Sequence, residues 1–173
     1  MSHRLPKVIV CLLLVSAIAG WVFYGNKYPY GRTHRCSKAL SSMLLEYAQE
    51  NNGNFPRSEV PNALGLSALI ESNPGALEYV VGKAGDLKAA ERFYDENGFL
   101  EARHSSWEYT EGLSVDDTER ALLWDRIPLG HHGERTKTNS REVILIGGRV
   151  LVVPEGEWKD FIKNQSNINQ IGT

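Results

Sequence analysis

The feature that most constrains this chain is an uninterrupted run of 18 uncharged residues near its N-terminus, residues 8–25. A helix that crosses the hydrocarbon layer of a bilayer needs about 20 apolar residues, within a range of roughly 17–25. The basic residues Arg4 and Lys7 precede the run, and aromatic residues typical of a membrane interface lie near its end. We therefore predict a helical anchor that binds membrane lipid through Val8, Leu12, Leu13, Leu14, Ile18, Trp21 and Phe23.

The same run is open to two other interpretations. Ala17, Ile18 and Ala19 before Gly20 satisfy the small-residue rule of a cleavable secretory signal. A run of this length is also compatible with a buried helix of a soluble protein. We favour a retained anchor, which makes the chain a single-pass membrane protein. Cleavage near Ala19 would instead release a secreted or periplasmic domain.

The charges that flank the run give conflicting indications of its orientation. More basic residues follow the run than precede it, so the positive-inside rule alone would keep the C-terminal part in the cytoplasm. However, a short basic segment followed directly by an apolar core has the shape of an export signal. We therefore expect the C-terminal part to lie outside the cytoplasm.

The rest of the chain has the length and composition of one globular domain. The whole sequence holds Lys+Arg 19 and Asp+Glu 21, and its first 25 residues contain no acid, so the remainder is mildly acidic. This balance argues against a nucleic-acid-binding protein, which would show a basic excess. We divide the chain into an anchor (1–25), a stem helix and turn (26–56), an α+β domain (57–165) and a polar tail (166–173).

A stem helix is predicted from about residue 33 to residue 51. Asn52 and Gly53 favour a left-handed cap at its end, and Pro56 prevents the helix from continuing. Its apolar residues recur at spacings of three and four and therefore share one face, which needs a partner such as a sheet. These residues are Leu40, Met43, Leu44 and Tyr47.

Downstream, turn residues and apolar runs alternate. Residues 63–70 and 86–94 have the pattern of helices, while residues 77–81 are compatible with either a helix or a strand. Alternating or β-branched runs predict strands at 106–110, 121–124, 143–146 and 150–153. Gly147 and Gly148 join the last two runs, and because glycine accepts positive φ, we predict a tight antiparallel hairpin there. A terminal helix is expected from residue 155.

The order of these features resembles bacterial pilin-like and pseudopilin-like proteins, especially the group with a prepilin-type processing-associated C-terminal domain. The stretches that carry the resemblance are Asn52-Gly53-Asn54-Phe55-Pro56, the loop Gly130-His131-His132-Gly133, and the hairpin 143–150. The chain is a divergent example, since the family's Asp-Gly-His turn is Gly147-Gly148-Arg149 here and the apolar run holds no Glu.

The resemblance implies an α+β fold in which a long N-terminal helix, anchor plus stem, packs on a small antiparallel sheet. It also implies a non-catalytic role in a bacterial cell-envelope assembly of the type II secretion or type IV pilus kind, at the inner membrane. The stem helix would then contact other copies of the chain or pseudopilin partners.

No motif in the sequence specifies a reaction, so we expect neither an enzyme nor a cofactor. The most chemically suggestive residues are His131 and His132, which would bind a metal only if His34, His104 or an acid joined them. The other interpretation is a solvated loop whose imidazoles form hydrogen bonds. The alternative function is accordingly an exported soluble domain that binds a metal or small ligand through this loop.

Overall fold

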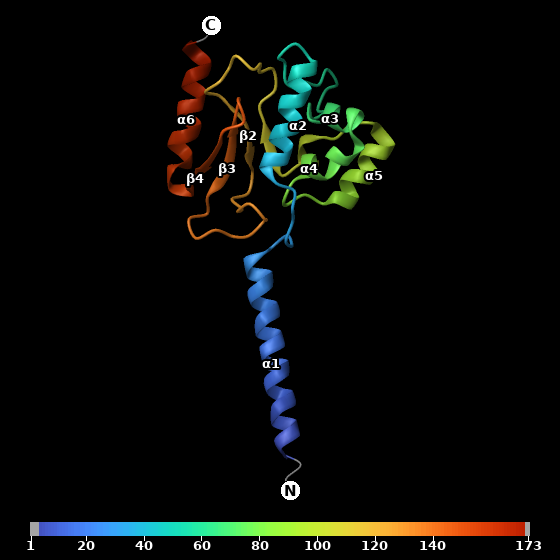
Figure 1. The fold of residues 1–173 in the computed structure, drawn as a ribbon, viewed down its shortest axis with the longest axis vertical. Helices are drawn as coiled ribbons and strands as arrows, with labels where there is room; N and C mark the ends of the chain where they lie inside the picture. The colour runs from blue at the N-terminus through green and yellow to red at the C-terminus, as the bar shows by residue number, and fades with distance from the viewer. Residues whose placement is uncertain (1–3, 172–173) are drawn as a thin grey trace.

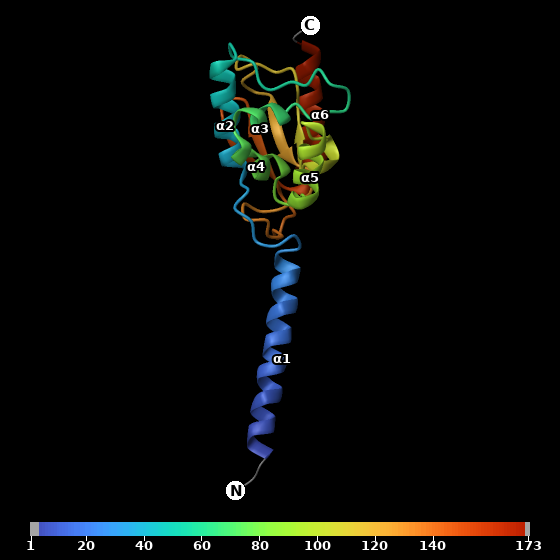
Figure 2. The ribbon, with the colours of Figure 1, turned by 90° about the vertical axis from the view of Figure 1, so that its right-hand side faces the viewer.

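The computed structural model describes residues 4–171, and it shows one long helix projecting from an α+β domain (Figures 1 and 2). This helix, α1 (Arg4–Lys27), contains a stretch, Ile9–Lys27, that is long and apolar enough to cross a membrane and is not buried at all. The predicted lipid-facing side chains from Leu12 to Phe23 are 58–84% exposed, whereas the side chain of Val8 lies outside the described residues. A membrane anchor and a signal sequence both fit this arrangement.

The stem helix is separated from α1, and it begins later than predicted. Helix α2 spans Ser37–Glu50, because the preceding Cys36 has an extended backbone and the Thr33 N–H donates to the carbonyl of His132 (3.1 Å). The linker backbone is therefore bound to a distant loop and cannot continue the helix. The end of α2 is as predicted, with Asn52 and Gly53 both at positive φ (55° and 82°).

A group of short helices follows. The helix predicted at 63–70 is displaced to 67–72, because the Leu64 N–H donates to the Leu100 carbonyl instead of starting a turn (2.6 Å). Residues 77–81, which the sequence left between helix and strand, are helical. The elements are α3 (Ser67–Ser72), η1 (Pro74–Ala76), α4 (Leu77–Val81), α5 (Leu87–Asn97) and η2 (Ala102–His104).

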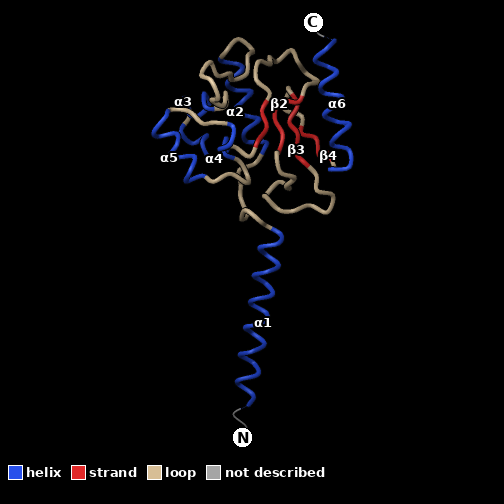
Figure 3. The backbone as a smooth tube through the Cα atoms, turned by 180° about the vertical axis from the view of Figure 1, so that it is seen from behind, coloured by secondary structure: helices blue, strands red, loops and turns tan. Residues whose placement is uncertain are grey.

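A four-stranded antiparallel sheet completes the domain, with its strands in the order β1-β2-β3-β4. Figure 3 shows β2, β3 and β4 side by side. The predicted hairpin is confirmed: Ile144 faces Val150, and Gly147 and Gly148 have φ values of 89° and 80°. The terminal helix α6 (Glu155–Ile171) runs through most of the segment predicted as a polar tail. The strands are β1 (Trp107–Tyr109), β2 (Ala121–Asp125), β3 (Arg141–Leu145) and β4 (Val150–Val153).

The sheet lies between two helical layers, with α2 to α5 on one face and α6 on the other (Figures 1 and 2). Because successive strand residues point to opposite faces, Ile144 joins the core formed with α2, whereas Val143 and Leu145 join the smaller core under α6. Leu40 and Leu44 of α2 have no exposed surface. The apolar face of the stem helix has thus found the sheet partner that its periodicity required.

Candidate functional site

The most unusual site is a set of buried charged side chains where the start of α2 meets the sheet. The ammonium of Lys83 donates to Asp125 Oδ2 (3.0 Å) and to Glu142 Oε2 (2.6 Å). The Lys83 side chain has no exposed surface, and those of Asp125 and Glu142 are 2% and 11% exposed. Lysine is almost never fully buried unless it is paired. We call Lys83, Asp125 and Glu142, with the hydroxyl of Ser37, the charged cluster.

Four segments that are far apart in the sequence meet at the charged cluster. Asp125 ends β2 and Glu142 lies near the start of β3, where the Glu142 N–H donates to Asp125 Oδ2 (3.2 Å). Ser37 is the first residue of α2, and its hydroxyl donates to Glu142 Oε2 (2.8 Å). Lys83 comes from the turn after α4. The cluster therefore fixes where the stem helix meets the sheet.

The position of Lys83 depends on close packing around the preceding turn. Gly82 has φ 76°, and a Cβ there would lie 2.6 Å from the indole nitrogen of Trp107. That indole nitrogen donates to the Tyr79 carbonyl (2.8 Å), and the Lys83 ammonium lies 5.1 Å from the centre of the Trp107 ring. Glycine at residue 82 thus lets the chain turn against the ring, which adds a cation–π contact to the buried ammonium.

One cation faces two carboxylates in the charged cluster, and burial is the main influence on the protonation of both acids. Burial raises the pKa of Asp125 to about 7, although Lys83 opposes the shift. Burial also disfavours the charged form of Glu142, but the Lys83 charge and the hydrogen bonds from Lys83 and Ser37 lower its pKa overall. Near neutral pH, Glu142 is therefore the permanent partner of Lys83, while Asp125 exchanges a proton.

The charged cluster has the groups of a catalytic site but not the access of one. The Ser37 hydroxyl and the Lys83 ammonium share one carboxylate oxygen, yet Ser37 is only 1% exposed. Solvent reaches the cluster at His131, whose side chain is 38% exposed and whose Nδ1 lies 3.4 Å from Glu142 Oε1. The arrangement suits holding segments together better than attacking a substrate.

The structure brings together only part of the predicted histidine site. The rings of His131 and His132 are in edge contact (4.9 Å between centroids), and His34 lies 5.7 Å from His132. His104 is elsewhere, against the ring of Phe93 (4.2 Å). Within residues 4–171, no three His, Cys, Asp or Glu side chains are placed to hold a metal ion. The buried Nδ1 of His132 has no hydrogen-bond partner.

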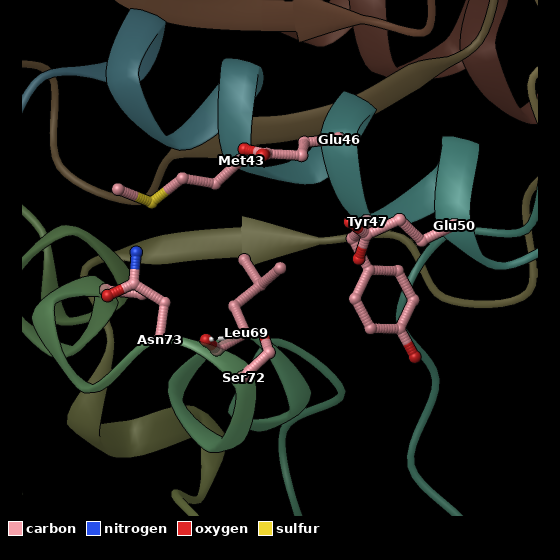
Figure 4. Close-up of a pocket in the computed structure, with 8 residues that line it drawn as sticks. Met43, Glu46, Tyr47, Glu50, Leu69, Ser72 and Asn73 are labelled. Atoms are coloured by element: carbon pink, nitrogen blue, oxygen red, sulfur yellow. Dashed lines mark hydrogen bonds between the residues drawn. The ribbon is translucent and has the colours of Figure 1, made fainter.

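The predicted assembly face of the stem helix is divided between core and surface. Leu40 and Leu44 lie in the core of their own domain and are not accessible to another molecule. Met43 and Tyr47 instead line a groove of about 310 Å³ between α2 and α3 (Figure 4). The remaining lining residues, two of them acidic, are Glu46, Glu50, Leu69, Ser72, Asn73 and Ala76.

Comparisons with protein-family profiles, with characterised proteins and with solved structures gave no match, so the function is argued from this geometry.

Proposed function

We propose that this chain is a non-catalytic, membrane-anchored, pseudopilin-like interaction protein of the bacterial cell envelope, with its domain outside the cytoplasm. The observation that carries the proposal is the exposure of the stretch Ile9–Lys27 of α1, whose apolar residues such as Leu13 (65%) and Trp21 (84%) are not buried by the chain. A helix that is apolar on all sides requires an apolar solvent or neighbouring helices. Membrane lipid supplies the apolar solvent, and a pilin-type assembly in a membrane supplies both lipid and neighbouring helices.

The arrangement of α2 supports the pseudopilin-like part of the proposal. A helix that follows the anchor packs on an antiparallel sheet, and the charged cluster fixes its first residue, Ser37, to that sheet. Because Leu40 and Leu44 are occupied by this packing, we assign lateral contact between copies to α1 and to the exposed side of α2. Such contact would transmit force from the anchor to the domain through the linker and the charged cluster.

Two measurements test the anchor and its orientation. Full-length protein should remain in the membrane fraction after a carbonate wash, and a fully soluble chain would contradict the proposal. Alkaline phosphatase fused after residue 60 should be active, because it folds only outside the cytoplasm. An inactive fusion on an expressed chain would reverse the orientation, in agreement with the basic residues that follow α1.

Lateral assembly is tested with the chain's own thiols. Cys11 is exposed on α1, so copies that associate through this helix should form a disulfide-linked dimer under mild oxidation in membranes. The Cys36→Ser variant should still be cross-linked and the Cys11→Ser variant should not. Cross-linking that depends only on Cys36 would move the contact away from α1.

A second candidate function is an exported soluble domain, released after Ala19, that binds a metal through the histidine loop. The observation that favours it is the unpartnered, buried Nδ1 of His132 beside His34 and His131. Mass spectrometry separates the two candidates, since a mature N-terminus at Gly20 supports release and an intact Met1 supports anchoring. Zinc binding by the intact protein that is lost in His132→Gln would support the metal site.

A further inference from the structure

The end of the domain nearest α1 is formed by two segments that are bound to each other. The linker 28–36 leads out of α1, and the loop between β2 and β3 folds back against it (Figure 1). The Arg135 N–H donates to the carbonyl of Lys27, the last residue of α1 (2.8 Å), and the Thr33 N–H donates to the His132 carbonyl (3.1 Å). The loop therefore holds a fixed position beside the end of the anchor.

These two segments carry four exposed cations. Lys27 and Arg32 belong to the anchor end and the linker, while Arg135 and Lys137 belong to the loop. Within residues 4–171, none of the four forms an ion pair with an acidic side chain. We call these four residues the basic foot.

Two acids near the loop part of the basic foot are bound to other groups. Glu134 directly precedes Arg135, and its carboxylate accepts the N–H of His132 (2.9 Å). Glu155, whose N–H reaches the Thr138 carbonyl, is paired with Arg141 (3.0 Å). Glu134 keeps its negative charge, because its donor is a neutral N–H, so the four cations of the foot exceed the unpaired acid beside them.

Aromatic residues mark the level at which the foot lies. Trp21 and Tyr24 are exposed on the last turns of α1, and the ring of Tyr24 contacts that of Tyr28 (5.1 Å). The ammonium of Lys27 lies 5.5 Å from the centre of the Tyr28 ring. Tryptophan and tyrosine are enriched at the level of the lipid headgroups. If α1 spans the bilayer, the basic foot lies where the phosphates of one leaflet are.

We propose that the basic foot docks the domain onto anionic phospholipid headgroups of the membrane that holds α1. The proposal rests on the anchoring role of α1 proposed above, and it adds that the domain itself binds the lipid surface. The phosphates are the nearest abundant anions at this level, and their negative charge matches four unpaired cations. Docking would fix the tilt of the domain relative to the membrane.

The test measures how close the loop lies to headgroups in vesicles that hold the full-length chain. A fluorophore on a cysteine at the exposed Asn139, in a Cys11→Ser/Cys36→Ser background, is quenched by a headgroup-attached quencher. Quenching should be stronger in vesicles that contain phosphatidylglycerol than in pure phosphatidylcholine. The variant Arg135→Gln/Lys137→Gln should lower the ratio of docked to undocked protein by about fivefold per cation removed.

A matched control removes the same charge from residues outside the basic foot. Arg57→Gln/Lys163→Gln should quench like the parent protein, because both side chains are exposed and lie outside the basic foot. About 0.5 M salt should abolish the extra quenching of the parent, because the Debye length then falls to a few ångströms. Equal effects of the two double variants would overturn the proposal.

The remaining outcomes separate this proposal from the anchor and from free anions. If the chain does not float with either kind of vesicle, the anchoring proposal itself is wrong. If it floats with both and quenching is the same in both, the anchor stands and the docking proposal is wrong. If inorganic phosphate competes away the extra quenching at millimolar concentration, the foot binds a free anion rather than the lipid surface.

Discussion

Helix α1 and the charged cluster both depart from the usual distribution of side chains, because α1 exposes apolar groups and the cluster buries charged ones. In α1, large apolar side chains such as Phe23 (70% exposed) have no protein around them. In the charged cluster, the ammonium of Lys83 has no solvent around it and lies between two carboxylates. The first arrangement is unfavourable in water and favourable in lipid, whereas the second is unfavourable wherever its partners are absent.

Helix α1 and the charged cluster therefore obtain their stability from different sources. Helix α1 needs nothing from the domain, because its hydrogen bonds are internal and its side chains suit a bilayer. The charged cluster depends on the whole fold, since α2, β2, β3 and the turn after α4 must all be in place to pair its charges. Changes in the cluster should therefore affect folding, and changes in α1 should affect location only.

The largest effect is expected from Lys83→Met, which leaves two buried carboxylates without their cation. Removal of one partner of a buried pair costs about 3–5 kcal/mol, so the free energy of unfolding in detergent should fall by that amount. The control Lys88→Met, on the exposed surface of α5, should change it by less than about 0.5 kcal/mol. Equal stability of the two variants would show that the cluster does not hold the domain together.

The next largest effect is expected from Ile18→Arg, which places a charge within the apolar part of α1. Arginine near the centre of a membrane helix should lower the ratio of integrated to soluble protein by about 100-fold. The Ile18→Leu control should remain integrated, and the denaturation midpoint of the domain should not change in either variant. A shift of that midpoint would mean that α1 contributes to the domain after all.

The two regions also differ in how well the sequence predicted them. The apolar N-terminal helix, the terminal hairpin and the apolar face of the stem helix follow from local patterns of charge, glycine and periodicity, and the structure contains all three elements. The face at Leu40 and Leu44 packs on the sheet, as its periodicity predicted, but the pattern alone could not say that Met43 and Tyr47 would stay outside this core and line a groove. Local patterns report which face is apolar, not what covers it.

The charged cluster was missed because it has no local pattern. Lys83 is 42 residues from Asp125 and 59 from Glu142, and each reads as an ordinary surface residue in its own segment. One signal was present: Asp125 directly follows the apolar run of β2, and Glu142 lies directly before that of β3. Two acids on paired antiparallel strands imply a buried counter-charge, but the sequence does not show which lysine supplies it.

A smaller effect is expected from pH, through Asp125. Its pKa is about 7 in the folded protein and 3.8 when unfolded, so between these values the folded state binds a proton that the unfolded state releases. Stability should therefore fall as pH rises from 5 to 8, by about 1–3 kcal/mol. The lowered pKa of Glu142 acts in the opposite direction, but only at pH values near and below its ordinary 4.5.

The Asp125→Asn variant tests this pH dependence. Asparagine keeps a similar shape but binds no proton, so its unfolding free energy should change little between pH 5 and pH 8. The informative quantity is the difference in slope between the two proteins, measured by denaturant titration at each pH. Parallel slopes would assign the proton exchange to another group.

The smallest effect is expected from His131→Gln, at the point where the charged cluster meets solvent. The imidazole Nδ1 lies 3.4 Å from Glu142 Oε1, but its side chain is 38% exposed, and pairs of this kind contribute about 0–1 kcal/mol. The free energy of unfolding should therefore fall by less than about 1 kcal/mol in His131→Gln, compared with the much larger fall in Lys83→Met. This result would show that His131 lies outside the charged cluster. A loss as large as that of Lys83→Met would make His131 an equal member, and the contrast between a buried cluster and an exposed α1 would no longer hold.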